Sequence, residues 1–306
     1  MSEGSDAGMA RSKAAVIVAI VSVGTAAVMI RYAESGPLTV AFYRMAFSTL
    51  FLLPWVLIYD RRQIAELSRK DWLRLAGIGL VLAAHFALWI TSVSKATGFH
   101  TTVANSAVLV TTHPLFVALI AAVYLKENPS KIALLGGVFA LFGVAIMFYG
   151  DLGGGGLTGD FLAVGGAIAA GVYLVAGRSE RKTLSTGTYC VVVYFFAMMF
   201  LMPLAFYESG LVPSANNDWL VFAVMAAVPG ILGHTLYNYA LGRVSAYFVS
   251  TTLLGEPIIS TVLAWILLSE EPARWAFVGA PIVLIGIVLA SGAWKPGGSG
   301  NQAAGA

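Results

Sequence analysis

Glu256 and Pro257 stand near the middle of an apolar run, Ala246–Leu268, that is long enough to cross a bilayer as a helix. A carboxylate is costly in hydrocarbon, and a proline leaves the carbonyl four residues before it without its helical partner. Lipid cannot satisfy that carbonyl, so the break must face protein or a water-filled cavity. The chemistry expected here is proton exchange or the binding of a substrate ammonium group.

The apolar run Thr101–Leu125 is interrupted in the same way by His113 and Pro114. Two proline-broken helices at corresponding places indicate the binding site of a transporter, so we expect Pro114, Glu256 and Pro257 to act in gating or coupling. A structural alternative remains for Glu256. Its carboxylate could accept hydrogen bonds from backbone N–H groups at the break and hold the fold, without any part in transport.

Other runs place aromatic and polar side chains on one helix face. His85 and Trp89 lie four residues apart, and His234, Tyr237 and Asn238 form a comparable face later in the chain. Aromatic rings beside polar donors suit a cavity for a small amphipathic solute, whereas the alternative is ordinary helix packing. The histidines lack carboxylate partners at ligand spacing, so no metal site is predicted.

Arg44, preceded by Tyr43, lies within the apolar run Leu38–Tyr59. An intramembrane arginine is a functional candidate, here as a clamp for the carboxylate of an amino acid. The alternative is that its side chain snorkels to the outer interface, which its shallow depth permits. Asn105 and Tyr173 are further candidates for lining a substrate cavity.

Composition places these residues in a polytopic, all-α membrane protein. Of 306 residues, 58% are hydrophobic and 11% charged, against roughly 25% charged in soluble domains. One cysteine excludes a disulfide framework and a cysteine-based zinc site. The net charge of +3 is spread over loops, which argues against nucleic acid as a partner. No glycine-rich segment is followed by the Lys-Ser/Thr of a phosphate-binding loop, and no cofactor is predicted.

Ten apolar segments predict ten transmembrane helices. The tails, 1–13 and 294–306, are small and polar and are predicted to be disordered. Residues 150–159 form a glycine-rich linker between 14–149 and 160–293. The segments are 14–30, 38–59, 72–91, 101–125, 132–149, 161–176, 189–207, 220–241, 246–268 and 275–293.

The basic residues predict the orientation. With the N-terminus inside, fourteen Lys and Arg residues fall in cytoplasmic segments and three (Arg31, Lys95 and Arg274) in outer loops. Positive charge favours the cytoplasmic side, so both termini are predicted to be cytoplasmic.

The two halves repeat one pattern. His113-Pro114 to Gly143 matches Glu256-Pro257 to Gly286 at a constant offset of 143, and Arg31 matches Arg178 at 147. Each half then holds five helices. Because five is odd, the second half enters the membrane from the opposite side, which predicts an inverted repeat around a central cavity. The matched glycines (Gly136 and Gly143, Gly279 and Gly286) are predicted to be helix-packing positions.

Each half also ends its broken fourth helix with Leu-x-Glu, as Leu125-Lys126-Glu127 and Leu268-Ser269-Glu270. In this the chain resembles the five-helix EamA-type repeats of the ten-helix transporters in the drug/metabolite transporter superfamily. Within that superfamily it looks most like bacterial exporters of amino acids, the aromatic amino-acid group especially, and of other metabolites. The resemblance implies alternating access around a cavity between the halves, in a bacterial plasma (inner) membrane.

The sequence favours a secondary transporter that exports small amphipathic metabolites, most plausibly amino acids. With no loop large enough for a nucleotide-binding domain, transport must follow a gradient or be coupled to an ion. A membrane-embedded enzyme would need a nucleophile with its base or paired carboxylates. Glu256 is the one acidic residue deep in a span, so no enzyme is predicted.

The sequence also leaves open a passive channel, and the same carrier fold used for another metabolite or drug. The expected partners are a small-molecule substrate and the lipid bilayer, and a monomer is compatible with this scheme.

Overall fold

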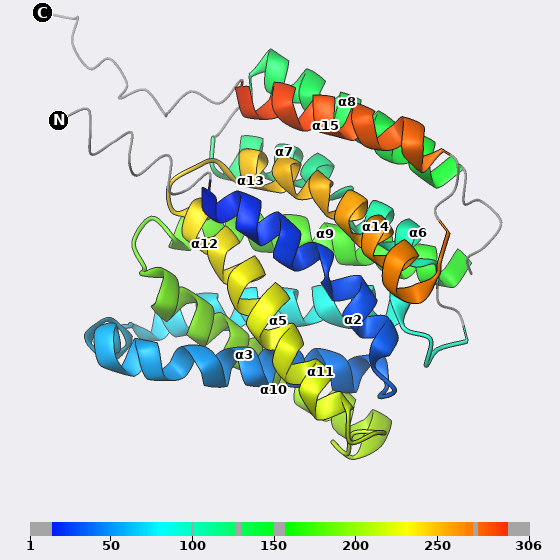
Figure 1. The fold of residues 1–306 in the computed structure, drawn as a ribbon. Coiled ribbons are helices and arrows are strands. Elements are labelled where there is room, and N and C mark those ends of the chain that lie inside the picture. The colour runs from blue at the N-terminus through cyan, green and yellow to red at the C-terminus, as the bar shows by residue number, and fades with distance from the viewer. Residues whose placement is uncertain (1–13, 99–100, 127–129, 150–156, 272–274, 293–306) are drawn as a thin grey trace, which may run out of the picture.

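The computed structural model describes residues 14–98, 101–126, 130–149, 157–271 and 275–292, and in these ranges it is helical with no strand (Figure 1). The predicted tails and most of the glycine-rich linker lie outside the described residues. The first helix spans Ala14–Tyr32, and α2 is its second part. The elements are α2 (Ala26–Tyr32), α3 (Pro37–Tyr59), α4 (Arg61–Ala65), α5 (Arg69–Val93), α6 (Val103–Val110), α7 (His113–Tyr124), α8 (Lys131–Tyr149), α9 (Leu157–Glu180), α10 (Thr186–Ser209), α11 (Asp218–Met225), the π-helix η1 (Ala226–Thr235), α12 (Leu236–Leu241), α13 (Ala246–Thr252), the 3-10 turn η2 (Leu253–Gly255), α14 (Glu256–Leu268) and α15 (Ala276–Gly292).

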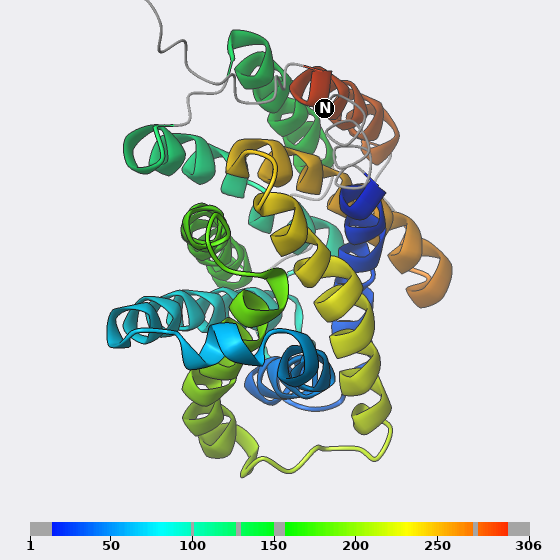
Figure 2. The ribbon, with the colours of Figure 1, turned by 90° about the vertical axis from the view of Figure 1, so that its left-hand side faces the viewer.

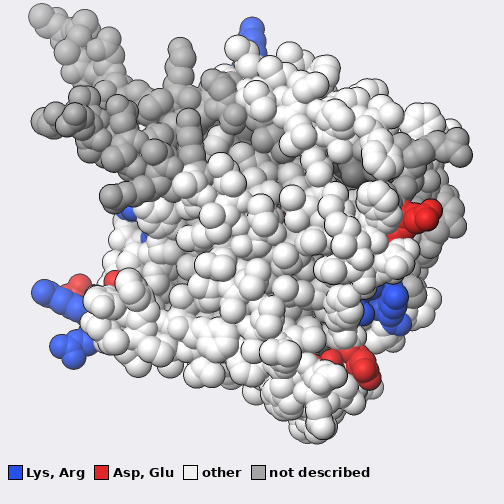
Figure 3. Space-filling view, in the orientation of Figure 1, with Lys and Arg blue, Asp and Glu red and all other residues white. Residues whose placement is uncertain are grey.

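Eight helical stretches of the described chain are long and apolar enough to cross a membrane. Two further apolar helices, α8 and α15, lie side by side at one edge of the bundle (Figures 1 and 2). On the face shown in Figure 3, the charged side chains gather mainly toward the two ends, with a broad uncharged zone between them. The described chain also exposes many large apolar side chains, such as Leu119, Phe142 and Ile266, which suits contact with lipid.

The first proline-broken run is divided between α6 and α7, as predicted. Pro114 has no N–H to offer the Val110 carbonyl, and Nδ1 of His113 donates to that oxygen instead, at 3.0 Å. A side chain therefore replaces the missing backbone donor, as a hydrocarbon environment requires.

The second run is divided into α13 and α14 by the turn η2. Here Pro257 has no N–H for the Leu253 carbonyl, which accepts a bond from the backbone N–H of Glu256. The break is thus satisfied by the backbone, and it does not need the side chain of Glu256.

The glycines of α8 and α15 are packing positions, which confirms the prediction. A Cβ on Gly143 would lie 2.7 Å from the Gly279 carbonyl oxygen, and one on Gly286 would lie 2.6 Å from the Gly136 carbonyl oxygen. Gly143 matches Gly286 in the repeat, and Gly279 matches Gly136, so the two contacts are equivalent. Their register makes the two helices antiparallel.

Helices α3 and α10 pair in a comparable way, with an acidic residue at each C-terminal end. Glu208 accepts hydrogen bonds from the backbone N–H groups of Leu38 and Thr39, at the start of α3. Asp60, just after α3, accepts from the hydroxyl of Ser185, the N-cap of α10, at 2.6 Å. Carboxylates are stabilised at helix N-termini, so both ends of this antiparallel pair are held by the same kind of contact.

Gly286→Ala is expected to lower the thermal stability of the purified protein, because a Cβ there would meet backbone atoms of α8 at 2.5–2.6 Å. Overpacking of this kind costs about 1–3 kcal/mol. The matched control is Gly77→Ala on α5, where a Cβ meets no atom within 4 Å and the lower chain entropy should leave stability equal or higher. Thermal unfolding in detergent measures both, and equal melting temperatures would contradict the packing role.

Candidate functional site

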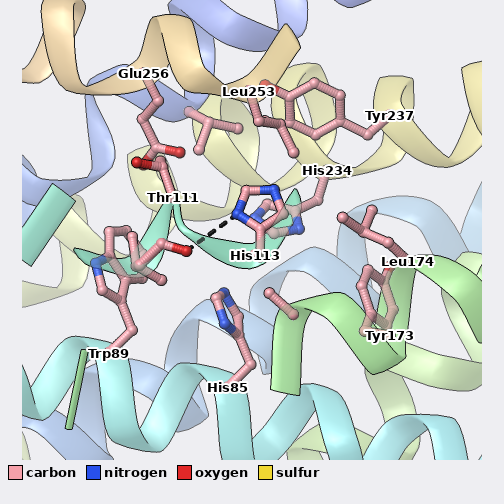
Figure 4. Close-up of a pocket in the computed structure, with 13 residues that line it drawn as sticks. His85, Trp89, Thr111, His113, Tyr173, Leu174, His234, Tyr237, Leu253 and Glu256 are labelled. Carbon is pink, nitrogen blue, oxygen red and sulfur yellow. Dashed lines mark hydrogen bonds between the residues drawn. The ribbon is translucent and has the colours of Figure 1, made fainter. Parts of the chain in front are cut away.

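A buried cavity lies between the two broken helices and α5, α9, η1 and α12 (Figure 4). The space in it open to water-sized molecules measures about 50 Å³, room for a few waters at about 10–15 Å³ each on this measure. Five of the nine residues predicted to line a substrate cavity do line it: His85, Trp89, Tyr173, His234 and Tyr237. Glu256 lines it as well.

The aromatic wall of the cavity is formed by α5 and η1 together. The rings of His85 and Trp89 lie nearly parallel with their centroids 6.0 Å apart, and the His234 ring is 6.4 Å from that of His85. The π-helical segment places His234 here. Single-turn π-bulges are common at functional sites, and this longer π-segment contains Pro229.

Two of the cavity histidines are held through the same ring nitrogen, Nδ1. Nδ1 of His85 lies 2.9 Å from the Gly166 carbonyl oxygen on α9, and Nδ1 of His113 bonds to the Val110 carbonyl. A carbonyl oxygen accepts but cannot donate, so each Nδ1 carries the hydrogen and each neutral ring keeps Nε2 as an acceptor. Nε2 of His113 is buried and has no hydrogen-bond partner among the described residues. These rings therefore offer acceptors to a ligand that carries N–H groups.

Asn238 does not line the cavity, but it holds two residues that do, Tyr173 and His234. Its Nδ2 donates to the hydroxyl oxygen of Tyr173 at 2.7 Å and to the backbone carbonyl of His234 at 2.8 Å. The hydroxyl of Tyr237, in contrast, is buried without a partner in the part of the chain that the structure describes. Tyr237 thus retains hydrogen-bonding capacity at the cavity.

Glu256 begins α14 and is 5% exposed. Within the described ranges no hydrogen bond reaches its carboxylate, and the ion pairs found there involve other side chains, on α4, α5 and α9. Backbone donors at the break therefore do not hold this side chain. The carboxylate is available to the cavity.

Arg44 is fully buried rather than extended to the interface. Its guanidinium carbon lies 4.4 Å from the ring centroid of Phe86 and 5.9 Å from that of Trp89. Its guanidinium and the Glu256 carboxylate do not form an ion pair within the described residues. Arg44 does not itself line the cavity, and it lies behind Trp89, which does.

Two predicted residues lie elsewhere. Tyr43 stacks on Phe222 with centroids 4.9 Å apart and donates to the Leu211 carbonyl at 2.7 Å, so it joins α3 to the α10–α11 connection. Asn105 lies in the first turn of α6, buried, with Oδ1 unpartnered among the described residues, and it does not line this cavity.

Pro114 and Pro257 each follow a cavity residue directly, and they create the helix breaks at which His113 and Glu256 reach the cavity.

His113 and Thr111 line the cavity although the sequence argument did not assign them there. One signal could have found His113. It precedes Pro114 as Glu256 precedes Pro257, so the repeat itself makes the two side chains counterparts.

The three cavity histidines do not form a metal centre. In the described part of the chain no group of three or more His, Cys, Asp or Glu side chains is arranged to hold a metal ion. Cys190, the one cysteine, is buried on α10 and does not line the cavity.

The sequence profile of the EamA-like transporter family matches residues 12–149 and residues 157–292. The chain belongs to the EamA-like transporter family. This confirms the resemblance to the drug/metabolite transporter superfamily and makes the chain a multi-pass membrane protein of a transporter family.

Relatives of this EamA-like chain are also transporters. An uncharacterized transporter of Archaeoglobus fulgidus is 26% identical over 268 residues, 84% of this chain and 88% of the relative. The pseudopaline exporter CntI of Pseudomonas aeruginosa is 22% identical over 292 residues, 91% of this chain and 96% of the relative. A protein of Streptantibioticus cattleyicolor named "Probable terminal-alkyne amino-acid exporter" is 23% identical over 193 residues, 62% of this chain and 64% of the relative.

A crystal structure of another protein superposes on this EamA-like chain with a TM-score of 0.72. The two are 17% identical, and the alignment covers 92% of this chain and 96% of the other. At this level of identity the likeness concerns the fold.

Proposed function

We propose that this protein is a secondary transporter that exports small amphipathic metabolites, amino acids above all, across the bacterial plasma membrane by alternating access. The observation that carries the proposal is the composition of the central cavity. His85, Trp89 and His113 come from the first predicted half, and Tyr237 and Glu256 come from the second. A solute held there touches both halves, so movement of one half against the other can expose it to either side.

Ten membrane spans in two inverted halves are part of this proposal, with α8 and α15 as the fifth and tenth. The equivalent glycine contacts between α8 and α15 support it, as does the matching pairing of α3 with α10. The two ranges matched by the family profile correspond to the two predicted halves.

A matched pair of arginines fits alternating access. Arg31, near the end of the first helix, donates to the Thr101 carbonyl just before α6, at 2.9 Å. Its counterpart Arg178, near the end of α9, donates to the Leu241 carbonyl at the end of α12, at 2.8 Å. In the proposed topology the first bond lies at the outer face and the second at the inner face.

The proposed orientation, with both termini inside, is testable by cysteine labelling. A cysteine at Asn216, exposed between α10 and α11, should react with an impermeant maleimide from outside. A cysteine at Lys182, exposed after α9, should react after the membrane is opened. Cys190 is buried, so the background is low. The reverse pattern would contradict the inverted-repeat topology.

Amino acids are proposed as substrates because the site combines apolar rings with buried groups of both charges. Glu256 can accept from an ammonium group, and Arg44 can donate to a carboxylate. The names of two relatives, an amino-acid exporter and the pseudopaline exporter, agree with a substrate of this kind.

Counterflow in proteoliposomes tests the function. Vesicles loaded with an unlabelled amino acid should accumulate the same labelled amino acid transiently, because a carrier exchanges solutes across its alternating states. A panel that includes leucine, methionine, phenylalanine and threonine covers the apolar and polar classes. Flux without counterflow would indicate a channel, and no flux for any amino acid would overturn the proposed substrate class.

A further inference from the structure

A surplus of hydrogen-bond donors is buried beside the cavity. Nε, Nη1 and Nη2 of Arg44 and Nε1 of Trp89 are all buried, and none has a hydrogen-bond partner among the described residues. Both side chains can donate but not accept. Leaving such donors unpaired is costly, so an acceptor group supplied by a ligand would be strongly favoured at this position.

Acceptors of the described residues do not fill this role. The Phe86 ring covers one side of the guanidinium, at 4.4 Å, and a ring face supplies no hydrogen-bonding oxygen. Glu256 is not within ion-pair distance of Arg44 in the described structure. The planar, forked guanidinium matches the two oxygens of a carboxylate, and Trp89 places a further N–H on the same side of α5.

Acceptors collect elsewhere in the same site. The carboxylate of Glu256 and the Nε2 atom of His85 belong to residues that line the cavity, and the buried Nε2 atom of His113, another lining residue, has no hydrogen-bond partner among the described residues. Three acceptors of this kind match the N–H groups of an ammonium ion. The site therefore offers separate partners for a positive and a negative group on one small solute.

We infer that Arg44 and Nε1 of Trp89 form a carboxylate subsite, with Glu256 and His113 as the ammonium subsite, and that the substrate class is the free amino acid. The inference rests on the proposed export function and adds that recognition requires an unmodified carboxylate. Amides, esters and simple amines with the same side chain are then poor substrates.

The first experiment uses the unaltered protein and paired probes in proteoliposomes. Each amino acid, L-leucine, L-methionine or L-phenylalanine, is compared with its carboxamide, which keeps the ammonium group and side chain but loses the anion. Counterflow of the acid should exceed that of the amide by at least about tenfold, because sites built to hydrogen-bond a group strongly reject analogues that lack it. Equal counterflow of acid and amide would overturn the carboxylate subsite while the export function stood. No counterflow of either would overturn both.

The second experiment assigns the selectivity to the residues. Arg44→Gln should reduce the acid-to-amide ratio to near one, and Trp89→Phe, which keeps the ring packing but removes the N–H, should reduce it less. The matched control is Arg243→Gln. Arg243 also lies over a ring, 3.9 Å from the centroid of Tyr239, but it is exposed and away from the cavity.

Folding is checked by thermal unfolding of each variant. If Arg44→Gln does not fold, the carboxylate subsite is tested by two other results. These are the acid-to-amide ratio of the Trp89→Phe protein and that of the unaltered protein. An unchanged acid-to-amide ratio in a folded Arg44→Gln protein would overturn the assignment to Arg44.

Discussion

Glu256→Gln is expected to abolish transport driven by a pH gradient while retaining counterflow at higher solute concentrations, because the amide oxygen can still accept a hydrogen bond from the ammonium group of the solute but carries no charge. Glutamine keeps the shape of the side chain and most of its hydrogen-bonding capacity, but it cannot bind and release a proton. Counterflow requires the exchange of conformations with solute bound, and it does not require a coupled proton. A selective loss of gradient-driven transport would therefore identify Glu256 as the coupling group.

The structure explains why the fold should tolerate this change. The carbonyl left by Pro257 is already satisfied by the backbone N–H of Glu256, through the turn η2. The carboxylate accepts no hydrogen bond from the described residues, so its charge does not hold the break. The pH dependence of transport will also depend on the other titratable groups that line the cavity, which are His85, His113, His234, Tyr173 and Tyr237, and on the buried charge of Arg44 behind Trp89.

The measurement compares uptake after a pH jump with counterflow at equal pH, in the same proteoliposomes. Glu66→Gln serves as the control. Glu66 is an exposed carboxylate that pairs with Arg62, and neither residue lines the cavity. Loss of both activities in a folded Glu256→Gln protein would indicate that the charge is needed to bind the solute, and it would not support a role in coupling alone. Retention of both would remove Glu256 from the mechanism.

The broken helices and the glycine contacts followed from the sequence because both depend on local rules. A proline at the centre of an apolar run interrupts a membrane helix wherever it packs, so the breaks before Pro114 and Pro257 were predictable. Glycines in matched helices mark close approach, as Gly143 and Gly286 show. Such features need no knowledge of neighbouring helices.

Residues whose role depends on the rotation of a helix about its axis were harder to place. Tyr43 was expected at the cavity, but it packs on Phe222 of α11, a contact that sequence spacing cannot reveal. The run 220–241 was expected as one regular helix, whereas it contains the π-helical segment η1, which changes the direction of His234. The hydrophobic pattern of a membrane span is too uniform to record either effect.

The position of Arg44 could be narrowed to two possibilities from the sequence, and the structure decides between them. Its depth in the run left two interpretations open, a clamp or a side chain that snorkels to the interface. The structure buries it completely because α5 brings the faces of Phe86 and Trp89 against the guanidinium. That partner helix is separated from Arg44 by a whole loop, so the sequence alone could not choose.

Arg31→Gln and Arg178→Gln are expected to shift the proposed alternating-access equilibrium in opposite directions. Each arginine holds the carbonyl of a segment that flanks a broken helix, Thr101 before α6 and Leu241 before α13. A hydrogen bond to a charged group contributes about 1.5–3 kcal/mol, and about 1.4 kcal/mol changes a two-state ratio tenfold. Loss of the outer bond should favour the outward-open state about tenfold, and loss of the inner bond should favour the inward-open state.

A cysteine at Thr111, which lines the cavity, can report the two states. With an impermeant maleimide, Arg31→Gln should raise its labelling from outside and lower its labelling from inside, and Arg178→Gln should do the reverse. Arg243→Gln, at an exposed position, should change neither. Because the two arginines are counterparts in the predicted inverted repeat, opposite effects are what the inversion demands. Changes in the same direction would mean that these bonds hold the fold and that neither belongs to one face of an alternating cycle.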